Sequence, residues 1–508
     1  MRLNKRKKQK SLNPIFTILT LTFIIMIVSL LFSVLGIEGH KSTIVNDSLE
    51  SSLTTVKNIF SLDGIHFLFG NIVNSFTTFE PLAYLVLSLI GISIGSASGL
   101  FQKLFSPLKK LRLSVLTFVL LLVSIISNII GEYSFMLLIP LAGVMYQYAG
   151  KNPMLGVMTA FLGTSIGYGT NIIFTYDDYA LGMLTQVAAN ATVDENYVFD
   201  LFSTSIIGPV STFILAFIGT IIITKFLAPK LPKKCHLDDE VVYKDSKVAA
   251  RISGVLFILI ALVIGYMIIP GLPGSGALLD HNETEYIAQL FSPNAPFRTG
   301  IILFITIILV LCSFIYGIIS GNLKSTEDCG LGLSKEFKNV GYLFVLLFFV
   351  SNMLAILNWT NLGSVITTRL VDFISTLQIS GMPLIIAVFI LIIIASILIP
   401  GNIEKWTLLS PIVIPLFMRA NITPDFTQVL FKAADGIGKS ISLFFVYFII
   451  MVGFLQKYNA ERKEEITLFG TLKILFPSIL LFTIVWILII IGWYLVGLPL
   501  GMNTMPTL

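Results

Sequence analysis

Long apolar stretches separated by short polar ones occupy most of the chain between residues 15 and 496. A run of about 20 apolar residues is long enough to cross the roughly 30 Å hydrocarbon core of a bilayer. The pattern predicts about nine transmembrane helices in one transmembrane domain over residues 1–508. They cover residues 15–36, 81–105, 154–189, 201–227, 252–269, 300–320, 340–357, 425–455 and 468–496. The predicted fold is therefore an all-α polytopic membrane protein.

Two further apolar segments, 113–149 and 383–420, are too long for one helix, and each contains a polar break. The breaks are Ser127–Glu132 and Pro400–Lys405. Irregular backbone survives at bilayer depth only where it is buried in protein or lines a wet cavity. We therefore expect each segment to be a re-entrant helical hairpin.

Each predicted hairpin precedes a helix that has its own glycine-rich break. Helix 154–189 is interrupted at Gly167–Asn171 and helix 425–455 at Asp435–Ser440. The order hairpin, turn, broken helix thus occurs twice, in a first repeat over 81–227 and a second over 340–455. Because one hairpin enters from each side in this topology, the chain is predicted to contain an inverted repeat, a plan typical of secondary transporters.

Polar segments complete the predicted topology. Residues 37–79 are polar and then mildly amphipathic, and we expect 66–79 to lie along the membrane interface, as does 361–378. Residues 228–251 form a basic cytoplasmic linker, and no soluble domain is long enough to fold alone.

The composition agrees with a membrane protein, since 55% of the residues are hydrophobic and 12% are charged. The net charge of +5 comes from basic residues in short loops on one side, which is the positive-inside pattern rather than a nucleic-acid surface. A multi-pass protein of the cell membrane with a cytoplasmic N-terminus follows, and nucleic acid is excluded as a partner. The first apolar run is too long for a signal peptide, so we expect it to be retained. The three cysteines show neither paired nor metal-binding spacing.

The ends of the half-helices at each break carry unpaired N–H and C=O groups. Such groups bind an anionic substrate and a small cation respectively. The breaks therefore predict a substrate site flanked by sites for a coupling ion, either sodium or a proton. No other cofactor is indicated.

Ionisable side chains fall at membrane depth in this topology, where each costs at least about 2.5 kcal/mol. We assign Asp178 and Asp435 to function, against the alternatives of a helix cap or a structural ion pair, whereas Asp177 is assigned a structural role. Lys405 is either functional or snorkels from a shallow hairpin. Trp406 either stacks on a planar substrate or anchors the hairpin at the interface.

The candidate residues form three groups. Substrate binding is predicted for Ser127, Asn128, Glu132, Asn171, Asp178, Asn402, Glu404, Trp406, Lys432, Asp435 and Lys439. Ion binding is predicted for Asn128, Gly169, Asn171 and Asp178. A hinge or structural role is predicted for Pro400, Gly401, Pro424, Gly436 and Gly438.

The motifs resemble those of the AbgT family, the p-aminobenzoyl-glutamate transporters, over nearly the whole chain. The resemblance is carried by Ser127-Asn128 with Glu132, by Gly167–Asn171 through Asp178 to Gln186, and by Lys405-Trp406 through Pro424 to Asp435. It implies a homodimer of nine-helix protomers with two hairpins each, in the ion-transporter superfamily. It also implies ion-driven movement of p-aminobenzoyl-glutamate or of sulfonamide antimetabolites. Asp178, Trp406, Pro424 and Asp435 match positions that matter in the family.

The chain departs from the family pattern around the second break. Pro400–Glu404 replaces a tip of small residues, Ser396 replaces an asparagine, and Lys432 replaces an arginine. In the run Gly436–Lys439, an amine stands where the family has an asparagine. Our hypothesis is that Lys439, paired with Glu404 or Asp435, replaces a second cation site. We also expect Lys432 or Lys439 to be available for a substrate carboxylate.

Other functions stay open from the sequence. A carrier of the same fold could move dicarboxylates or peptide-like cell-wall fragments. A channel would share the breaks, although two opposed hairpins suit alternating access better. A membrane-embedded enzyme acting on a lipid-linked substrate is the alternative from another class, but the chain has no HExxH motif.

Overall fold

The structure, a computed structural model, describes residues 12–45, 48–232, 235, 242–376, 379–459 and 466–508. Within these residues, nine helical stretches are long and apolar enough to cross a membrane. They are α1 (Pro14–Val34), α2 with α3 (Leu62–Thr77, Glu80–Ala97), α5 with the turn η2 (Leu113–Ile126, Ser127–Ile130), α9 and the turns after it (Ile207–Ile222, then to Lys230), α10 (Lys247–Met267), α12 (Pro296–Ser320), α14 (Gly341–Trp359), α16 (Gly381–Leu398) and α20 (Leu468–Val496). The number matches the prediction, but the membership does not. Each predicted hairpin contributes an arm to this set, while the predicted helices 154–189 and 425–455 are absent from it.

The first predicted hairpin folds back on itself. After α5 and η2 the chain turns at Gly131, whose φ of 62° is in the left-handed region that favours glycine, and continues as α6 (Tyr133–Tyr148). Thr117 near the start of α5 and Tyr146 near the end of α6 lie 3.2 Å apart through their hydroxyl oxygens. With 14 residues, α5 is only about 21 Å long. The start of α5 and the end of α6 are thus brought together because the chain reverses at the break.

The second break is shorter than predicted. It covers only Ile399, Pro400 and Gly401, and α17 (Asn402–Arg419) begins directly afterwards. Proline lacks an N–H, and the residue before it disfavours the helical conformation, which explains why α16 ends at Leu398. Glu404 and Lys405, predicted to lie in the break, are instead in the first turn of α17.

The two predicted broken helices differ from each other. The first consists of α7 (Pro153–Ile166), the turn η3 (Gly167–Gly169) and, after an extended stretch, α8 (Tyr176–Asn190). The second does not break at Asp435–Ser440, because α18 (Pro424–Ile441) runs through it and the chain bends by 42° only before α19 (Val446–Lys457).

The two glycines of α18 for which a hinge or structural role was predicted allow close packing. A Cβ on Gly436 would lie 2.2 Å from the carbonyl oxygen of Ser165 in α7. A Cβ on Gly438 would lie 2.5 Å from the Cβ of Ser396 in α16. Small residues let membrane helices approach in this way without unwinding. Of the two roles predicted for these residues, close packing corresponds to the structural one.

A β-hairpin was not predicted. β1 (Glu38–Val45) and β2 (Ser48–Thr55) pair in antiparallel register, with Glu38 opposite Thr55 and Val45 opposite Ser48. β1 packs on α15 (Leu362–Ser375), where Arg369 Nε donates to the carbonyl oxygen of Glu38 at 2.5 Å. The β-branched residues Thr43, Ile44 and Val45 in β1 and Thr54 and Thr55 in β2 favour strands, although the stretch looks simply polar.

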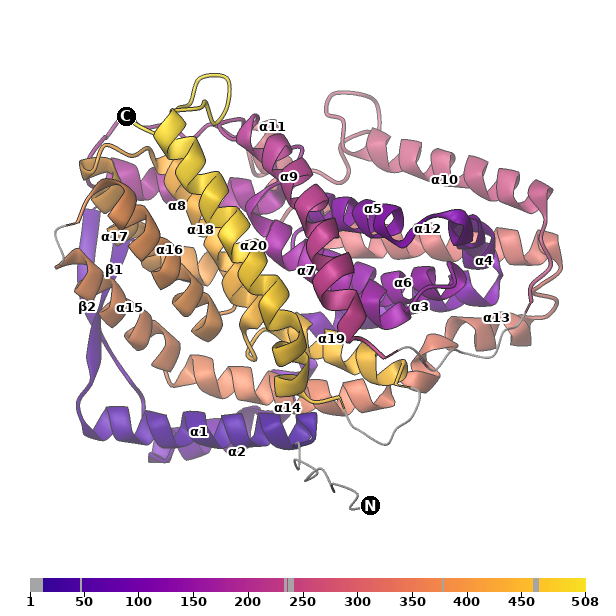
Figure 1. Cartoon of the computed structure of the whole chain (residues 1–508), viewed down its shortest axis with the longest axis horizontal. Helices are drawn as coiled ribbons and strands as arrows, with labels where there is room; N and C mark the ends of the chain where they lie inside the picture. Colours follow the sequence, from indigo (N-terminus) through magenta and orange to yellow (C-terminus); the bar gives the residue numbers. More distant parts are fainter. Residues whose placement is uncertain (1–11, 46–47, 233–234, 236–241, 377–378, 460–465) are drawn as a thin grey trace, which may run out of the picture.

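The central helices are α7 and α18, and the others surround them. Figure 1 shows α20 lying across α18 and α9, while α1 and α2 lie beside α14 at one edge and the β-hairpin stands at the end near α15 and α17. Three short helices, α4 (Leu100–Phe105), α11 (Tyr286–Phe291) and α13 (Thr326–Leu333), lie in the connections. The predicted all-helical membrane fold therefore holds, with the β-hairpin as an addition.

Candidate functional site

A cavity of about 510 Å³ lies where two of the chain breaks meet. Its wall includes both predicted hairpin tips and the start of α8. The first tip contributes Ile130–Tyr133, the second Gly401–Glu404, and α8 contributes Tyr176 and Asp177; Thr78–Pro81, Tyr84, Arg298 and Tyr447 complete the wall. Segments more than 250 residues apart in the chain thus share one cavity, which we call the central cavity.

Asparagine amides hold the first break in place. Asn128 Nδ2 donates to the carbonyl oxygens of Thr164 at 3.0 Å and of Ile125 at 3.2 Å. Asn171 Nδ2 donates to the carbonyl oxygens of Ile126 at 3.1 Å and Ile125 at 3.2 Å. These contacts pair carbonyl groups that the end of α5 leaves open. The ion-binding role of Asn128, Gly169 and Asn171 stays a prediction.

A buried network of four charges lies behind the first tip. The Asp435 carboxylate accepts hydrogen bonds from Lys405 and Ser396, and its other oxygen lies 3.3 Å from Lys439 Nζ. Lys439 also donates to Glu132 at 3.0 Å. The side chains of Lys405 and Asp435 are fully buried, whereas that of Glu132 is 36% exposed. Two ammonium groups and two carboxylates therefore balance, and the network reaches the central cavity only through Glu132.

Lys405 does not snorkel, contrary to one of the two interpretations of the sequence. Its position in the first turn of α17 directs the ammonium group inward to Asp435 on α18. A buried ammonium group that lacks a carboxylate partner is much less stable than a paired one. The pairing explains why this lysine tolerates complete burial.

A second buried ion pair joins α8 to α18. Lys432 Nζ lies 2.5 Å from Asp178 Oδ1, and the other oxygen of Asp178 accepts from the backbone N–H and the hydroxyl group of Thr175. Asp178 therefore acts both as the reciprocal helix cap of α8 and as an ion-pair partner. These are the structural roles that the sequence left as alternatives to function.

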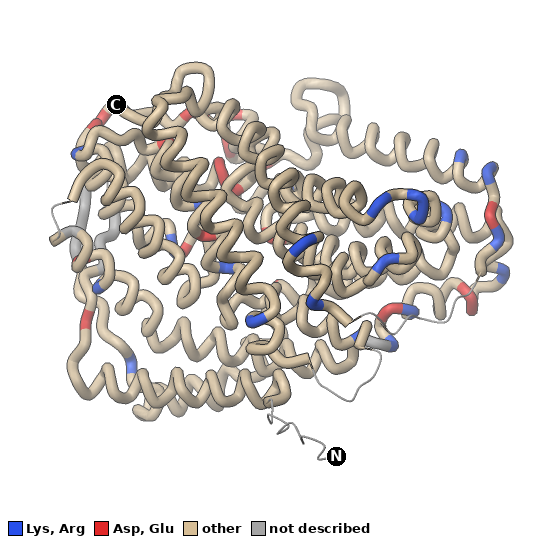
Figure 2. The backbone as a smooth tube through the Cα atoms, in the orientation of Figure 1, with Lys and Arg blue, Asp and Glu red and all other residues tan. Residues whose placement is uncertain are grey.

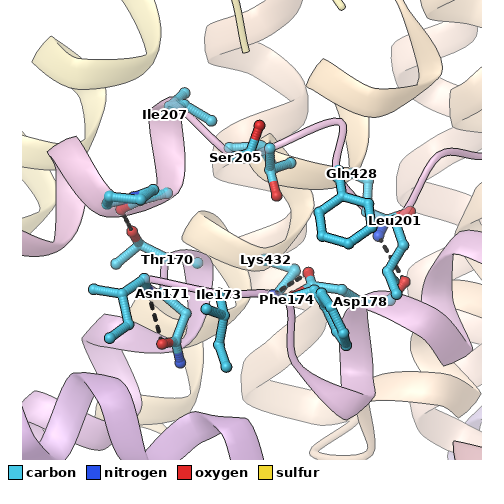
Figure 3. A pocket seen from close by; sticks show the side chains of 17 residues that line it. Thr170, Asn171, Ile173, Phe174, Asp178, Leu201, Ser205, Ile207, Gln428 and Lys432 are labelled. Atoms are coloured by element: carbon cyan, nitrogen blue, oxygen red, sulfur yellow. Dashed lines mark hydrogen bonds and ion pairs between the residues drawn. The ribbon is translucent and has the colours of Figure 1, made fainter. Parts of the chain in front are cut away.

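The Lys432–Asp178 pair forms part of the wall of a smaller pocket of about 170 Å³. Figure 3 shows the pair meeting beside Phe174, with Thr170 and Asn171 on the other side of the pocket. Most of the remaining wall is apolar. This pocket is separate from the central cavity in the conformation described.

Trp406 lines none of the three described cavities and is not exposed at the surface. It is fully buried, its ring centroid is 4.3 Å from that of Phe431, and its Nε1 donates to Thr185 Oγ1 at 2.9 Å. Thr185 in turn donates to Gln428 at 2.7 Å. Trp406 thus ties α17 to α8 and α18 in this conformation, and its role in substrate binding stays a prediction.

Glu404 and Asn402 have different surroundings. Glu404 is exposed and lines both the central cavity and a neighbouring cavity of about 400 Å³. Glu404 is not within ion-pair distance of Lys439. Of the two carboxylates predicted to pair with Lys439, only Asp435 does so. Asn402 is buried, and its Nδ2 donates to Asp177 Oδ2 at 3.2 Å. Asp177, which we had assigned a purely structural role, therefore belongs to the wall of the central cavity.

Of the remaining candidates, Gly401 lines the central cavity, whereas Ser127, Pro400 and Pro424 do not. Ser127 donates to the Ser124 carbonyl oxygen at 2.7 Å and so continues α5. Pro424 opens α18 after the Thr423 cap. Pro400 lies in the second break without lining the cavity, while Gly401 lines it.

Several wall and network residues were missed from the sequence. Tyr168 lies under both lysines, with its ring centroid 4.7 Å from Lys439 Nζ and 5.2 Å from Lys432 Nζ. Its place inside the Gly167–Asn171 break was the available signal. Arg298 gave no such signal, because it lies just ahead of an apolar run and looks like an interfacial residue.

Comparisons with known proteins agree with this architecture. Residues 6–508 match the profile of a family described as "AbgT putative transporter family". The chain is 25% identical over 508 residues to the p-aminobenzoyl-glutamate transport protein of Escherichia coli K12, covering 98% of this chain and 94% of that protein.

Two solved structures are similar to the fold. The Neisseria gonorrhoeae MtrF structure, described as illuminating a class of antimetabolite efflux pumps, gives a TM-score of 0.50 at 25% identity, covering 98% of each chain. The Alcanivorax borkumensis YdaH transporter gives a TM-score of 0.50 at 21% identity, covering 97% of this chain and 100% of that one.

Proposed function

Because the chain belongs to the AbgT transporter family over nearly its full length, we propose that it is an ion-gradient-driven secondary transporter of a small amphiphilic or anionic metabolite. The family resemblance of the motifs is confirmed, and the chain is a transporter rather than an enzyme. Metabolites similar to p-aminobenzoyl-glutamate, or antimetabolites such as sulfonamides, are the proposed solutes.

The observation that carries the proposal is the meeting of the two hairpin tips and the start of α8 at one cavity. A volume of about 510 Å³ lies within the roughly 300–1,000 Å³ typical of small-molecule sites. Broken helices at such a site are the way secondary transporters expose polar backbone to a solute. The exposed Glu404 between two cavities supports a path along the second tip.

We propose alternating access of the elevator type, with two oppositely inserted hairpins. The close approach of α7 and α18, where Ser165 Oγ donates to the Gly436 carbonyl oxygen at 2.9 Å, supports their movement as one rigid unit. The fold-back at Gly131 and the break at Pro400 support the hairpins. Since the family resemblance implies a dimer, we also propose that the protein is a homodimer.

The proposed orientation places the N-terminus in the cytoplasm. Figure 2 shows Lys and Arg gathered at the end of the molecule where α4, α13 and the start of α10 lie. Basic loops are enriched on the cytoplasmic side of cell-membrane proteins. That end is therefore the proposed cytoplasmic side.

Counterflow in proteoliposomes tests the carrier function. Vesicles loaded with an unlabelled solute are expected to accumulate the labelled solute transiently, because a carrier exchanges one molecule for another. The solutes to compare are p-aminobenzoyl-glutamate, a sulfonamide, a dicarboxylate and a muropeptide. Equilibration at the same rate with empty and loaded vesicles would indicate a channel and contradict the proposal.

We further propose that Lys439 replaces a cation at Asp435. Its ammonium group lies 3.3 Å from one carboxylate oxygen, and Lys405 contacts the other, so both oxygens already face a positive charge. A fixed ammonium group supplies charge without binding an ion. This leaves the region of Asn128 and Asn171 as the proposed place for one coupling ion.

Separate sodium and proton gradients test the replacement. Transport by the wild-type protein is expected to use at most one sodium ion per cycle. Lys439→Asn is expected to raise the number of coupled cations by one. The neutral amide no longer pairs with the second carboxylate oxygen of Asp435, which can then bind a cation. Two sodium ions per cycle in the wild-type protein would contradict the replacement.

A further inference from the structure

Among the described residues, Arg298 is the one cation in the wall of the central cavity. It lies at the start of α12 and makes no ion pair with any described residue. Its Nη1 is buried and has no hydrogen-bond partner. By contrast, Lys405, Lys432 and Lys439 all have carboxylate partners. The lysines expected to receive a substrate carboxylate are thus already paired, and Arg298 is left for that role.

The ring of Tyr176 holds the Arg298 guanidinium group in place. The central guanidinium carbon lies 3.6 Å from the ring centroid, which is the distance of a close cation–π contact. Tyr176 is the first residue of α8 and also lines the cavity. A guanidinium group held in this way is prepared for two parallel hydrogen bonds to a carboxylate.

Hydrogen-bond acceptors dominate the rest of the wall. Asn402 is 6% exposed, and its Oδ1 has no partner although its Nδ2 is bonded to Asp177. Four carboxylates, those of Glu80, Glu132, Asp177 and Glu404, line the same cavity, and of these Lys439 neutralises Glu132. Arg298 alone does not balance the remaining three. A ligand that brings a positive nitrogen therefore fits this wall better than one with only negative charge.

Tyrosine rings provide the apolar surface between these groups. Tyr84, Tyr133, Tyr176 and Tyr447 line the cavity, and the rings of Tyr84 and Tyr133 contact edge to face at 4.5 Å. Aromatic faces attract both flat apolar groups and cations.

We propose that the central cavity recognises a zwitterion with an aromatic or apolar body, such as an amino acid or a short peptide. Its carboxylate binds Arg298, and its ammonium group faces Asn402 and the neighbouring carboxylates. This assignment rests on the central cavity being the solute site of the transporter proposed above. It makes Arg298 a specificity-determining residue.

Three probes that share a phenylethyl group and differ in their charged groups test the charge pattern on the purified full-length chain. Phenylalanine carries both charges, phenethylamine only the positive one and 3-phenylpropionate only the negative one. Isothermal titration calorimetry is expected to give phenylalanine about tenfold or more the affinity of either analogue, since each charged group gains a charge-assisted contact. Equal or tighter binding of either analogue, or no binding of phenylalanine, would overturn the proposal.

Variants of Arg298 test its role. Arg298→Gln is expected to weaken phenylalanine about tenfold while phenethylamine changes less than about twofold, and Arg298→Lys should lie between. Lys103→Gln is the matched control, because Lys103 pairs with the exposed Asp245 far from the cavity wall. An equal loss for phenylalanine and phenethylamine in Arg298→Gln would mean that Arg298 only supports the fold, and would overturn its assignment.

The outcome is separable from the carrier function. If any solute shows counterflow but the binding assay shows that the protein prefers 3-phenylpropionate to phenylalanine, only the recognition of a zwitterion is refuted. Absence of exchange for every solute, with phenylalanine still bound, would refute the carrier function and leave the recognition of zwitterions standing.

Discussion

Replacing Asp435 with asparagine is expected to abolish transport and to lower the free energy of unfolding by about 3–5 kcal/mol. Asp435 is fully buried and faces two ammonium groups, those of Lys405 and Lys439. The amide removes one negative charge and leaves Lys405 buried without a carboxylate. Thermal unfolding in detergent measures the stability, and counterflow measures transport.

A double variant separates the two effects. Lys405→Met combined with Asp435→Leu removes both charges of the buried pair, so it is expected to be more stable than Asp435→Asn while transport stays lost. Asp245→Asn is the matched control, since its partner Lys103 is at the surface and such pairs contribute only about 0–1 kcal/mol. Normal stability of Asp435→Asn would show that Lys405 does not depend on this carboxylate.

Gly436→Ala is expected to destabilise the protein by about 1–3 kcal/mol or more and to impair transport. The added Cβ would lie 2.2 Å from the Ser165 carbonyl oxygen, closer than real Cβ atoms come to such an atom. Because that atom belongs to the backbone of α7, the two helices must separate. Their separation would displace Asp435, the neighbouring residue, from Lys405.

Gly254→Ala in α10 is the control for this helix-packing prediction. No heavy atom lies within 4 Å of the position of its Cβ, so only helix propensity changes, by up to about 1 kcal/mol in the stabilising direction. Equal melting temperatures of the two variants would contradict the packing role of Gly436.

The apolar pattern predicted most of the architecture because hydrocarbon imposes strong rules on backbone hydrogen bonds. Gly131 and Pro400 mark real breaks, since a left-handed φ and a missing N–H act locally. Gly436 and Gly438 could not be interpreted in the same way. Whether a glycine unwinds a helix or admits a neighbour depends on what packs against it, which only the tertiary structure reveals.

The pairing of charges was harder to predict than their presence. Asp178, Asp435 and Lys439 were singled out because ionisable groups at membrane depth are rare. Their partners, however, lie far away in sequence, since Lys432 is 254 residues from Asp178 and Glu132 is 307 residues from Lys439. A local pattern carries no information on such distances, so the partner of Lys405 could not be predicted. Arg298 was missed for another reason, because it lies just ahead of an apolar run and looks like an interfacial residue.

Protection of two cysteines by solute tests the central claim most directly, namely that both breaks line one solute cavity. Ile130→Cys and Ile403→Cys each place a thiol in the wall of that cavity, one from each tip, in a background without Cys235, Cys312 and Cys329. Leu272→Cys in the exposed loop after α10 serves as the control. The solute that counterflow identifies is expected to slow modification of both wall thiols by a water-soluble reagent and to leave the modification of Leu272→Cys unchanged. Protection of only one wall thiol, or of neither, would contradict a shared cavity.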